Sequence, residues 1–265
     1  MQQRHLNRQQ YFSELANTSR DFYIDYLRQF TDIGLSARIL EVGCGEGGNL
    51  LPFAEAGCLV TGIDLSITRI EQAKHFFESC RQKGTFLCQD FLTSQAPENE
   101  DERYDVIFMH DVIEHIGSQQ KTAFIEHVKS FIKHGAVVFV AFPPWQMPFG
   151  GHQQIGKGFV SKMPYVHLLP NPLYRLLITL SGNNEGCVRE LLNIKQCRMT
   201  IEHFETLTAD TGFRIRQKTF WFINPHYKQK FHLQPRRLWR WAGKLPYIRN
   251  FYITSTFYIL DLPEP

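Results

Sequence analysis

Several features are missing from this 265-residue chain, and each absence excludes a class of protein. The longest apolar run, Ala136–Trp145, is only half of the roughly 20 residues that a transmembrane helix needs, and Pro143 and Pro144 interrupt it. The first residues, 1–5, lead into polar sequence with no apolar segment, so no secretory signal is expected. The six cysteines form no CxxC pair and are too sparse for a disulfide scaffold, which favours a reduced, cytoplasmic setting.

Acidic residues are also absent from one long stretch. Residues 211–260 contain ten Lys or Arg, no Asp or Glu, and thirteen aromatic residues. The chain has 29 basic and 26 acidic residues, so the rest of it carries 19 basic against 26 acidic residues. Such an asymmetry indicates an acidic partner, for example a membrane surface, a nucleic acid or an anionic substrate. A solvated basic face on ordinary elements is the alternative.

What is present is a regular alternation of short apolar runs and segments with helical spacing. The composition, with 43% hydrophobic residues, supports a globular core. The expected strands are Ala37–Val42, Cys58–Ile63, Thr85–Cys88, Tyr104–Met109, Ala136–Phe142, Phe213–Phe222 and Phe251–Leu260, and the expected helices among them are Asn49–Ala56, a helix after the N-cap Ser66, Lys121–Lys133 and Ile201–Ala209. This alternation predicts an α/β fold with a doubly wound, Rossmann-like sheet.

A glycine loop follows the first expected strand. Gly43, Gly45 and Gly47 are spaced GxGxG, whereas a dinucleotide-binding loop is spaced GxGxxG. The flanking Glu41 and Glu46 would repel a phosphate, so the loop favours a cationic ligand. Asp64 ends the second expected strand 21 residues after Gly43, where a carboxylate can accept both hydroxyls of a ribose.

Four motifs together resemble a known family. Ile39–Leu50 resembles motif I of the class I S-adenosylmethionine-dependent methyltransferases, and Gly62–Ser66 resembles their second motif. Gln89–Phe91 resembles the element that places a carboxylate beside adenine. Residues 104–115 resemble the fourth motif, in the form seen in ubiquinone-type and related small-molecule methyltransferases. The resemblance implies S-adenosylmethionine as the cofactor and a seven-stranded sheet with an antiparallel last strand.

The resemblance also implies roles for the first two motifs. Gly43, Gly45 and Gly47 would shape the loop around the cofactor. Glu41 would steady that loop or the amino group of the methionine part. Asp64 would accept the ribose hydroxyls.

The later motifs carry further implied roles. Leu65 would pack on adenine, and Asp90, with Phe91 beside it, would take the adenine amino group. The alternative for Asp90 is a turn residue or a helix N-cap. His110 and Asp111 would lie near the methionine part of the cofactor, at the end of the fourth strand.

The expected elements and the resemblance together predict a single domain. Residues 1–36 are expected to be helical and 37–144 to form the cofactor-binding core. Residues 145–197 would be a lid or substrate insertion after strand five. Residues 198–265 would be a closing helix and hairpin, interrupted after strand six by the basic and aromatic insertion 224–250.

Candidate catalytic residues come from the histidines. Transfer to a hydroxyl needs a base, and imidazole suits that role near neutral pH. His115 and His152 are the leading candidates, although each is equally compatible with a structural, hydrogen-bonded role, and His110 stands behind them because that structural role is favoured for it. His152 lies between glycine and glutamine in a loop directly after the fifth strand, and active-site residues favour such loops.

A metal site is weighed but not predicted. Asp111, Glu114 and His115 lie at i, i+3 and i+4, one face of a helical turn, and could ligate a divalent ion. Certain ubiquinone-pathway and small-RNA methyltransferases that look similar here use a metal, but they carry Glu where this chain has Asp111. Three adjacent ligands without a fourth are weak evidence.

The predicted activity is methyl transfer to an oxygen of a small apolar or aromatic acceptor, such as a quinone precursor or lipid-like phenol. Met163–Leu180 could wall such an acceptor or form a satellite core. The alternatives are an RNA or protein methyltransferase and a non-catalytic S-adenosylmethionine-binding protein. The chain lacks an Asn/Asp-Pro-Pro-Tyr motif, so nucleic acid is not favoured as partner. Residues 224–250 are expected to contact an anionic membrane or to be a basic surface over the hairpin.

Overall fold

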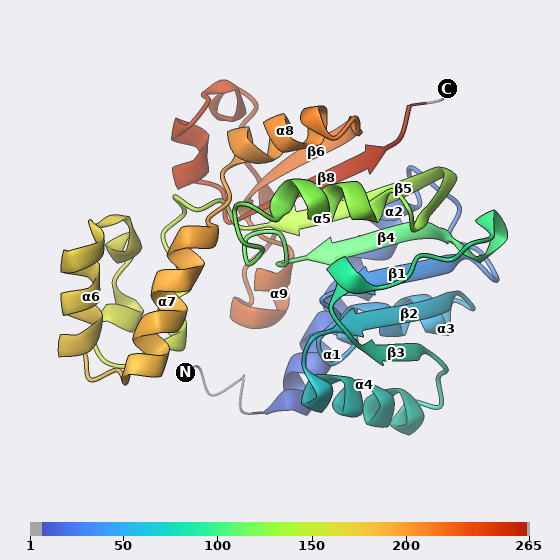
Figure 1. The fold of residues 1–265 in the computed structure, drawn as a ribbon, viewed down its shortest axis with the longest axis horizontal. Helices are drawn as coiled ribbons and strands as arrows, with labels where there is room; N and C mark the ends of the chain where they lie inside the picture. Colours follow the sequence, from blue (N-terminus) through green and yellow to red (C-terminus); the bar gives the residue numbers. More distant parts are fainter. Residues whose placement is uncertain (1–6, 264–265) are drawn as a thin grey trace.

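A mixed β-sheet organises the computed structural model, which describes residues 7–263 (Figure 1). Its strands are β1 (Arg38–Val42), β2 (Leu59–Asp64), β3 (Thr85–Cys88), β4 (Tyr104–His110), β5 (Ile132–Phe142), β6 (Arg214–Ile223), β7 (Arg236–Arg237) and β8 (Ser255–Asp261). Their order is β3-β2-β1-β4-β5-β8-β6-β7. Strands β1 to β5 are parallel, and β8 is antiparallel to both β5 and β6. The predicted Rossmann-like fold is confirmed, and the two-residue β7 adds an eighth strand at the edge.

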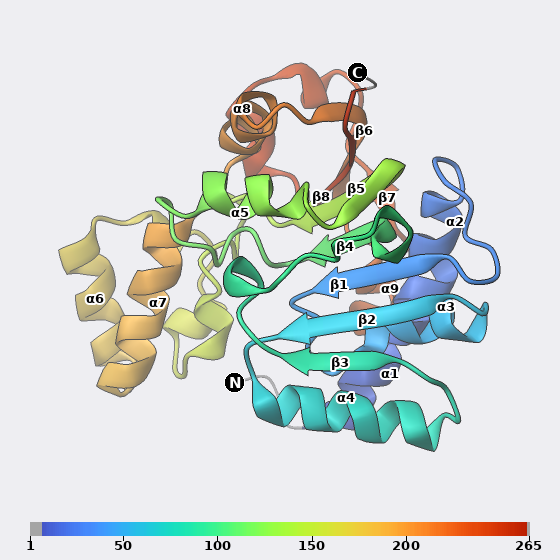
Figure 2. The same cartoon turned by 45° about the vertical axis from the view of Figure 1, so that its right-hand side comes forward.

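Helices cover both faces of the sheet (Figure 2). One face carries α1 (Arg8–Thr18), a π-helical turn (Ser19–Tyr23), α2 (Ile24–Leu27), α3 (Leu51–Glu55) and α4 (Ile67–Ser79), and the other carries α5 (Lys121–Val128) and α8 (Ile201–Asp210). Neighbouring strand residues serve opposite faces, so buried Ile39 packs with Phe53 of α3, whereas Leu40 packs with Phe124 of α5. A parallel sheet covered on both sides accounts for the continuous apolar runs in the sequence.

Some predicted element ends are confirmed and others are wrong. Ser66 caps α4 as predicted, because its hydroxyl accepts a hydrogen bond from the Arg69 amide at 3.4 Å. The helix predicted over residues 121–133 ends at Val128, since Ile132 already belongs to β5. The Lys133 ammonium lies 2.9 Å from a carboxylate oxygen of Asp105 in β4, and this ion pair accompanies the earlier start of the strand.

The insertion over residues 145–197 forms a small helical unit. It contains α6 (Asn171–Leu180) and α7 (Glu185–Cys197), which pair beyond the carboxyl ends of the parallel strands (Figure 1). Its buried residues form a separate apolar cluster of Val160, Val166, Tyr174, Ile178, Val188 and Leu191. The satellite core weighed for Met163–Leu180 is therefore present, while Leu173, Leu176 and Leu180 remain exposed. The insertion is thus held by its own core rather than by the sheet.

The second insertion, residues 224–250, begins with α9 (His226–Phe231) and includes β7. The His226 ring contacts the Thr18 hydroxyl of α1 at 3.0 Å, so α9 packs beside the N-terminal helix. Among residues 7–263, no helix is both long and apolar enough to cross a membrane. The organisation predicted for residues 1–6 and 264–265 lies outside the described residues.

Candidate active site

A cavity of about 430 Å³ opens at the carboxyl ends of β1, β2 and β4. Strand order reverses direction at β1, and ligands of open α/β sheets bind at this position. The cavity is lined by Val42, Gly43, Ile63, Asp64, Leu65, Ser66, Arg69, Gln89, Asp90, Phe91, Asp111, Val112, His115, Ile116 and Phe124. Residues of all four sequence motifs therefore line one cavity, and the first motif contributes Val42 and Gly43 to it.

The glycine loop needs glycine at its three spaced positions. Gly43, Gly45 and Gly47 all have positive φ angles, of 72°, 52° and 78°. A Cβ on Gly43 would lie 2.6 Å from a methyl of Val112, whereas a Cβ on Gly45 would meet no protein atom within 4 Å. Gly43 therefore lets the loop pack against the turn after β4, and the space beside Gly45 is open.

Asp64 is fixed at the end of β2 by backbone amides. One carboxylate oxygen accepts a hydrogen bond from the Gly45 amide at 2.9 Å, and the other accepts one from Ser66 at 2.8 Å. A carboxylate oxygen can accept more than one bond, so both retain acceptor capacity toward the cavity. Asp64 thus ties the glycine loop to the second motif while lining the cavity.

The third motif has a mixed outcome. Asp90 lines the cavity, and one of its carboxylate oxygens also accepts a hydrogen bond from the Leu92 amide at 3.0 Å, so it serves as an N-cap as well. Phe91 is buried between Phe124 and Phe131, so its ring forms a wall of the cavity. Leu65 is 74% exposed at the cavity rim, where an apolar ligand surface could cover it.

Glu41 lies behind the loop rather than in the cavity. Its side chain is buried and accepts a hydrogen bond from the Asn49 amide group at 2.7 Å. Burial, opposed by that hydrogen bond, raises the pKa of Glu41 to about 8. Of its two implied roles, this contact fits the steadying of the loop, because Asn49 lies at the loop's far end.

His110 and Asp111 form a polar chain with Tyr23 at the end of β4, buried at Tyr23 and open to solvent at Asp111. The Tyr23 hydroxyl lies 2.8 Å from His110 Nε2, and His110 Nδ1 lies 3.3 Å from a carboxylate oxygen of Asp111. Asp111 has a φ angle of 56°, a left-handed conformation that is uncommon outside glycine. Desolvation opposes its ionisation, but the neighbouring His110 and then His152 and His115 bring the pKa of Asp111 down to about 2. Asp111 is therefore a fixed negative charge at the cavity.

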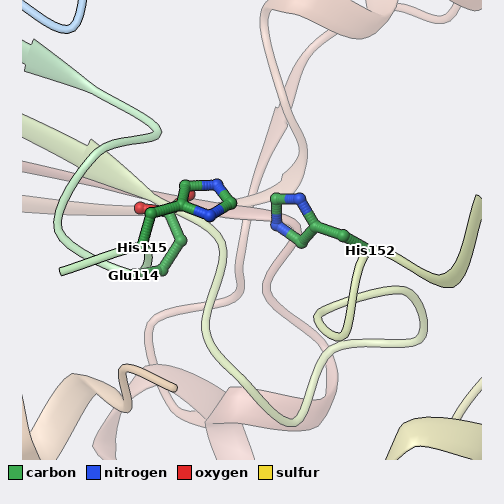
Figure 3. A group of neighbouring side chains, drawn as sticks. All are labelled: Glu114, His115 and His152. Carbon is green, nitrogen blue, oxygen red and sulfur yellow. The ribbon is translucent and has the colours of Figure 1, made fainter. Parts of the chain in front are cut away.

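The two predicted catalytic histidines meet from distant segments (Figure 3). His115 lines the cavity after β4, and His152 comes from the loop after β5, with the ring centroids 4.8 Å apart and the planes at 89°. His152 has a φ angle of 52°, set within a loop whose His152 amide bonds the Phe149 carbonyl at 3.0 Å. Non-glycine residues in this conformation gather at functional sites.

The surroundings of both imidazoles favour their neutral form. Burial, followed by the charge on His115, lowers the pKa of His152 to about 4. Burial also lowers the pKa of His115, while the charge of Asp111 opposes that change. A neutral imidazole carries a free lone pair, so each ring can accept a proton or bind a metal.

Glu114 completes a group of three possible metal ligands with these histidines. The ligand atoms of Glu114, His115 and His152 all lie within 4.8 Å of one another (Figure 3). Glu114 is buried, burial raises its pKa, and neither carboxylate oxygen has a hydrogen-bond partner among residues 7–263. These donors fit a divalent ion. They differ from the set considered from the sequence, Asp111, Glu114 and His115, because His152 takes the place of Asp111. The prediction that the site needs no metal stays a prediction.

Several site residues carried no usable sequence signal. Tyr23 lies in an N-terminal helix whose spacing predicted only an apolar face, yet its hydroxyl reaches His110. Tyr227 of α9 is close enough to Asp111 for that charge to raise its pKa, after burial, to about 12. Neither contact could be read from the chain, because the partners are separated by 87 residues or more.

The comparisons with known sequences agree with the four motifs. Residues 39–135 match the family model described as a methyltransferase domain. A ubiquinone biosynthesis O-methyltransferase from Chelativorans sp. (strain BNC1) is 36% identical over 105 residues, 39% of each chain. The enzyme of the same name from Coxiella burnetii (strain RSA 493 / Nine Mile phase I) is 33% identical over 127 residues, 47% of this chain and 50% of that one. The matched region thus spans half or less of these curated relatives.

Solved structures extend the likeness to nearly the whole fold. An S-adenosylmethionine-dependent methyltransferase from Clostridium acetobutylicum has a TM-score of 0.58 at 12% identity, covering 94% of this chain and 92% of that one. Magnesium protoporphyrin IX methyltransferase from Synechocystis PCC 6803, with bound SAH, gives 0.56 at 16% identity, covering 94% and 84%. At such identities these structures show the fold alone. By the family match, residues 39–135 belong to a methyltransferase domain, and the solved structures show that the chain has the fold of S-adenosylmethionine-dependent methyltransferases.

Proposed function

We propose that this protein transfers a methyl group from S-adenosylmethionine to an oxygen atom of a small apolar or aromatic acceptor. One observation carries the proposal. The cavity joins the glycine loop, Asp64 and Asp90 at one end to His115 at the other, and His152 stands directly behind His115. A cofactor site and a proton acceptor thus share one cavity.

The cofactor would occupy the end of the cavity beside β2. Asp64 is aimed by two backbone amides and would accept the ribose hydroxyls. Asp90 would meet the adenine amino group, and Leu65 and Phe91 would contact the adenine ring from the cavity wall. The sulfonium would lie toward Asp111, whose negative charge favours a cation.

In this reaction the protein would mainly align the two reactants and remove a proton from the acceptor. The sulfonium is already an activated methyl donor, so the chain supplies an in-line approach and excludes water. His115 would accept the acceptor hydroxyl's proton, and Asp111 would stabilise the imidazolium that results. If Glu114, His115 and His152 instead held a divalent cation, its positive charge would favour the ionised form of that hydroxyl, and His115 would then be a ligand rather than the base.

The acceptor would enter between the core and the insertion over residues 145–197. His152 stands in this insertion, and the loop around it is fixed by buried Gln153, whose amide donates to the Pro148 and Met163 carbonyls at 3.1 and 2.9 Å. His167 Nε2 contacts the Trp145 carbonyl at 2.8 Å. Apolar side chains dominate this insertion, which supports an apolar or aromatic acceptor.

The relatives' names support the same acceptor class. The similar sequences are named ubiquinone biosynthesis O-methyltransferases, but the family model covers the cofactor end and stops at residue 135, before the insertion. The decisive experiment incubates the protein and S-adenosylmethionine carrying a radiolabelled methyl group with fractionated cell extract. We expect the label to enter organic solvent. Label recovered only in RNA or protein would overturn the acceptor proposal, while leaving methyl transfer intact.

A further inference from the structure

We propose that the second insertion docks on an anionic lipid bilayer through a basic–aromatic surface. This surface is made of Phe222, Arg236, Arg237, Trp239, Arg240, Trp241, Lys244, Leu245, Tyr247 and Ile248, all of them exposed. The proposal does not depend on the methylation reaction, because it rests on the surface chemistry of these residues alone.

The aromatic part of this surface is a ladder of stacked rings in solvent. Trp239 and Trp241 are each 66% exposed, and their ring centroids lie 6.3 Å apart with the planes at 6°. Phe222 stacks on Trp239 at 6.2 Å. The chain has four tryptophans, and the other two, Trp145 and Trp221, are buried. Exposed tryptophans in a row are unusual on a water-facing surface and typical of the headgroup level of a membrane.

The basic part of the surface lacks acidic partners. Arg236, Arg237, Arg240 and Lys244 form no ion pair with a carboxylate of the described chain. Other cations of this region are paired, for example Arg249 with Glu202 at 3.1 Å and Lys228 with Asp21 at 2.7 Å. Four cations without a carboxylate partner, of which Arg237 lies over the Trp221 ring at 5.7 Å, complement an anionic surface.

Exposed aliphatic side chains favour lipid over nucleic acid as the partner. Leu245 and Ile248 are exposed beside Tyr247, and the same turn packs onto the sheet because Gly243 lies against Phe220. A nucleic acid offers bases for the aromatic rings and phosphates for the arginines, but nothing that buries leucine and isoleucine. The boundary between headgroups and acyl chains accepts all three kinds of side chain.

The docking surface lies close to the first insertion. In both overall views the segment after α9 lies beside α8 (Figures 1 and 2), whereas α9 itself packs against α1. Tyr165 of the first insertion donates a hydrogen bond to the Phe251 carbonyl at 3.4 Å, just beyond this surface. A bilayer bound here would therefore lie next to the first insertion.

The test is co-sedimentation of the full chain with lipid vesicles. Vesicles in which about three in ten lipids are phosphatidylglycerol are compared with pure phosphatidylcholine vesicles at low salt. We expect binding to the anionic vesicles alone, with a blue shift of tryptophan fluorescence because only Trp239 and Trp241 can change environment. Raising the salt from about 0.1 M to about 1 M shortens the screening length from about 10 Å to about 3 Å and should weaken binding.

Two variants assign that binding to the surface. Arg236→Gln with Arg240→Gln should lower the vesicle partition coefficient about tenfold or more, since each basic residue near an anionic membrane contributes about fivefold. The matched control, Lys74→Gln with Lys83→Gln, removes the same charge from exposed positions by β3, at the opposite edge of the sheet. Circular dichroism verifies that both double variants are folded.

The outcomes separate clearly. A loss confined to the arginine variant, together with loss of the fluorescence shift in Trp239→Ala with Trp241→Ala, supports the proposal. Equal losses in the lysine control, or equal binding to neutral vesicles, would overturn it. Tighter binding to polyuridylate than to anionic vesicles at the same salt would assign the surface to single-stranded nucleic acid instead.

Discussion

The two ends of the cavity are built by different means. At the end beside β2, the backbone sets the geometry: the three glycines have left-handed conformations, and two amides hold Asp64. At the other end, side chains from three distant segments converge, namely Tyr23 on His110, His115 after β4, and His152 after β5. Binding of the donor is therefore expected to depend on local sequence, and turnover on contacts between segments.

The largest effect is expected at the backbone-built end. Asp64→Ala removes a carboxylate proposed to accept both ribose hydroxyls and frees the Gly45 amide. Loss of two charge-assisted hydrogen bonds should weaken S-adenosylmethionine binding about 1,000-fold, as measured by calorimetry. Glu78→Ala, an exposed carboxylate on α4, serves as the control and should leave binding unchanged. Affinity of Asp64→Ala within twofold of the parent would show that the cofactor lies elsewhere.

The next largest effect separates turnover from binding. His152→Asn removes the imidazole while keeping a residue that tolerates the φ angle of 52°. We expect kcat to fall about 100-fold, with the affinity for S-adenosylmethionine changed less than threefold. His134→Asn, at an exposed position at the start of β5, should keep full activity. If the two variants have the same kcat, the proposal that the first insertion takes part in catalysis is wrong.

The acid side of the pH profile tests the neutral imidazoles. An ordinary histidine, with a pKa near 6.5, is only about one tenth neutral at pH 5.5. Since burial lowers the pKa of His152 to about 4, and lowers that of His115, the neutral forms persist as the pH falls. The acid limb of the kcat/KM profile should therefore lie below pH 6.5, so that more than about one tenth of the plateau remains at pH 5.5. An acid limb centred near 6.5 would contradict this environment.

A smaller effect is expected from the N-terminal helix. Tyr23→Phe removes the hydroxyl that contacts His110 and leaves the buried ring in place. Loss of one hydrogen bond should lower kcat about threefold to tenfold through the orientation of His110 and Asp111. The donor's affinity should stay within twofold, because Tyr23 does not line the cavity. If only the thermal stability changes and kcat does not, the contact between Tyr23 and His110 is structural and has no role in turnover.

The smallest effect is expected from metal removal. If His115 acts as a proton acceptor, dialysis against a chelator should change turnover less than twofold. Loss of activity with recovery on adding one divalent ion would instead assign Glu114, His115 and His152 to a metal. The variant Glu114→Gln is informative in the second case, because it should then abolish recovery.

The difference between the two ends of the cavity also explains what could be predicted from the sequence. Motif I, Asp64 and Asp90 lie at strand ends, so strand order alone brings them to one cavity. The pairing of His115 with His152 and the reach of Tyr23 depend on how a loop and a helix pack, which no local pattern specifies. The helix predicted to continue to Lys133 fails for a related reason: the ion pair of Lys133 with Asp105 belongs to a strand pairing between distant residues.

The most direct measurement is calorimetric titration of the full-length protein with S-adenosylhomocysteine, the demethylated product. One molecule should bind per chain, and Asp64→Ala should abolish the heat while remaining folded. A folded parent protein that takes up neither this product nor S-adenosylmethionine would contradict the assignment of the cavity between β1, β2 and β4 as the donor site.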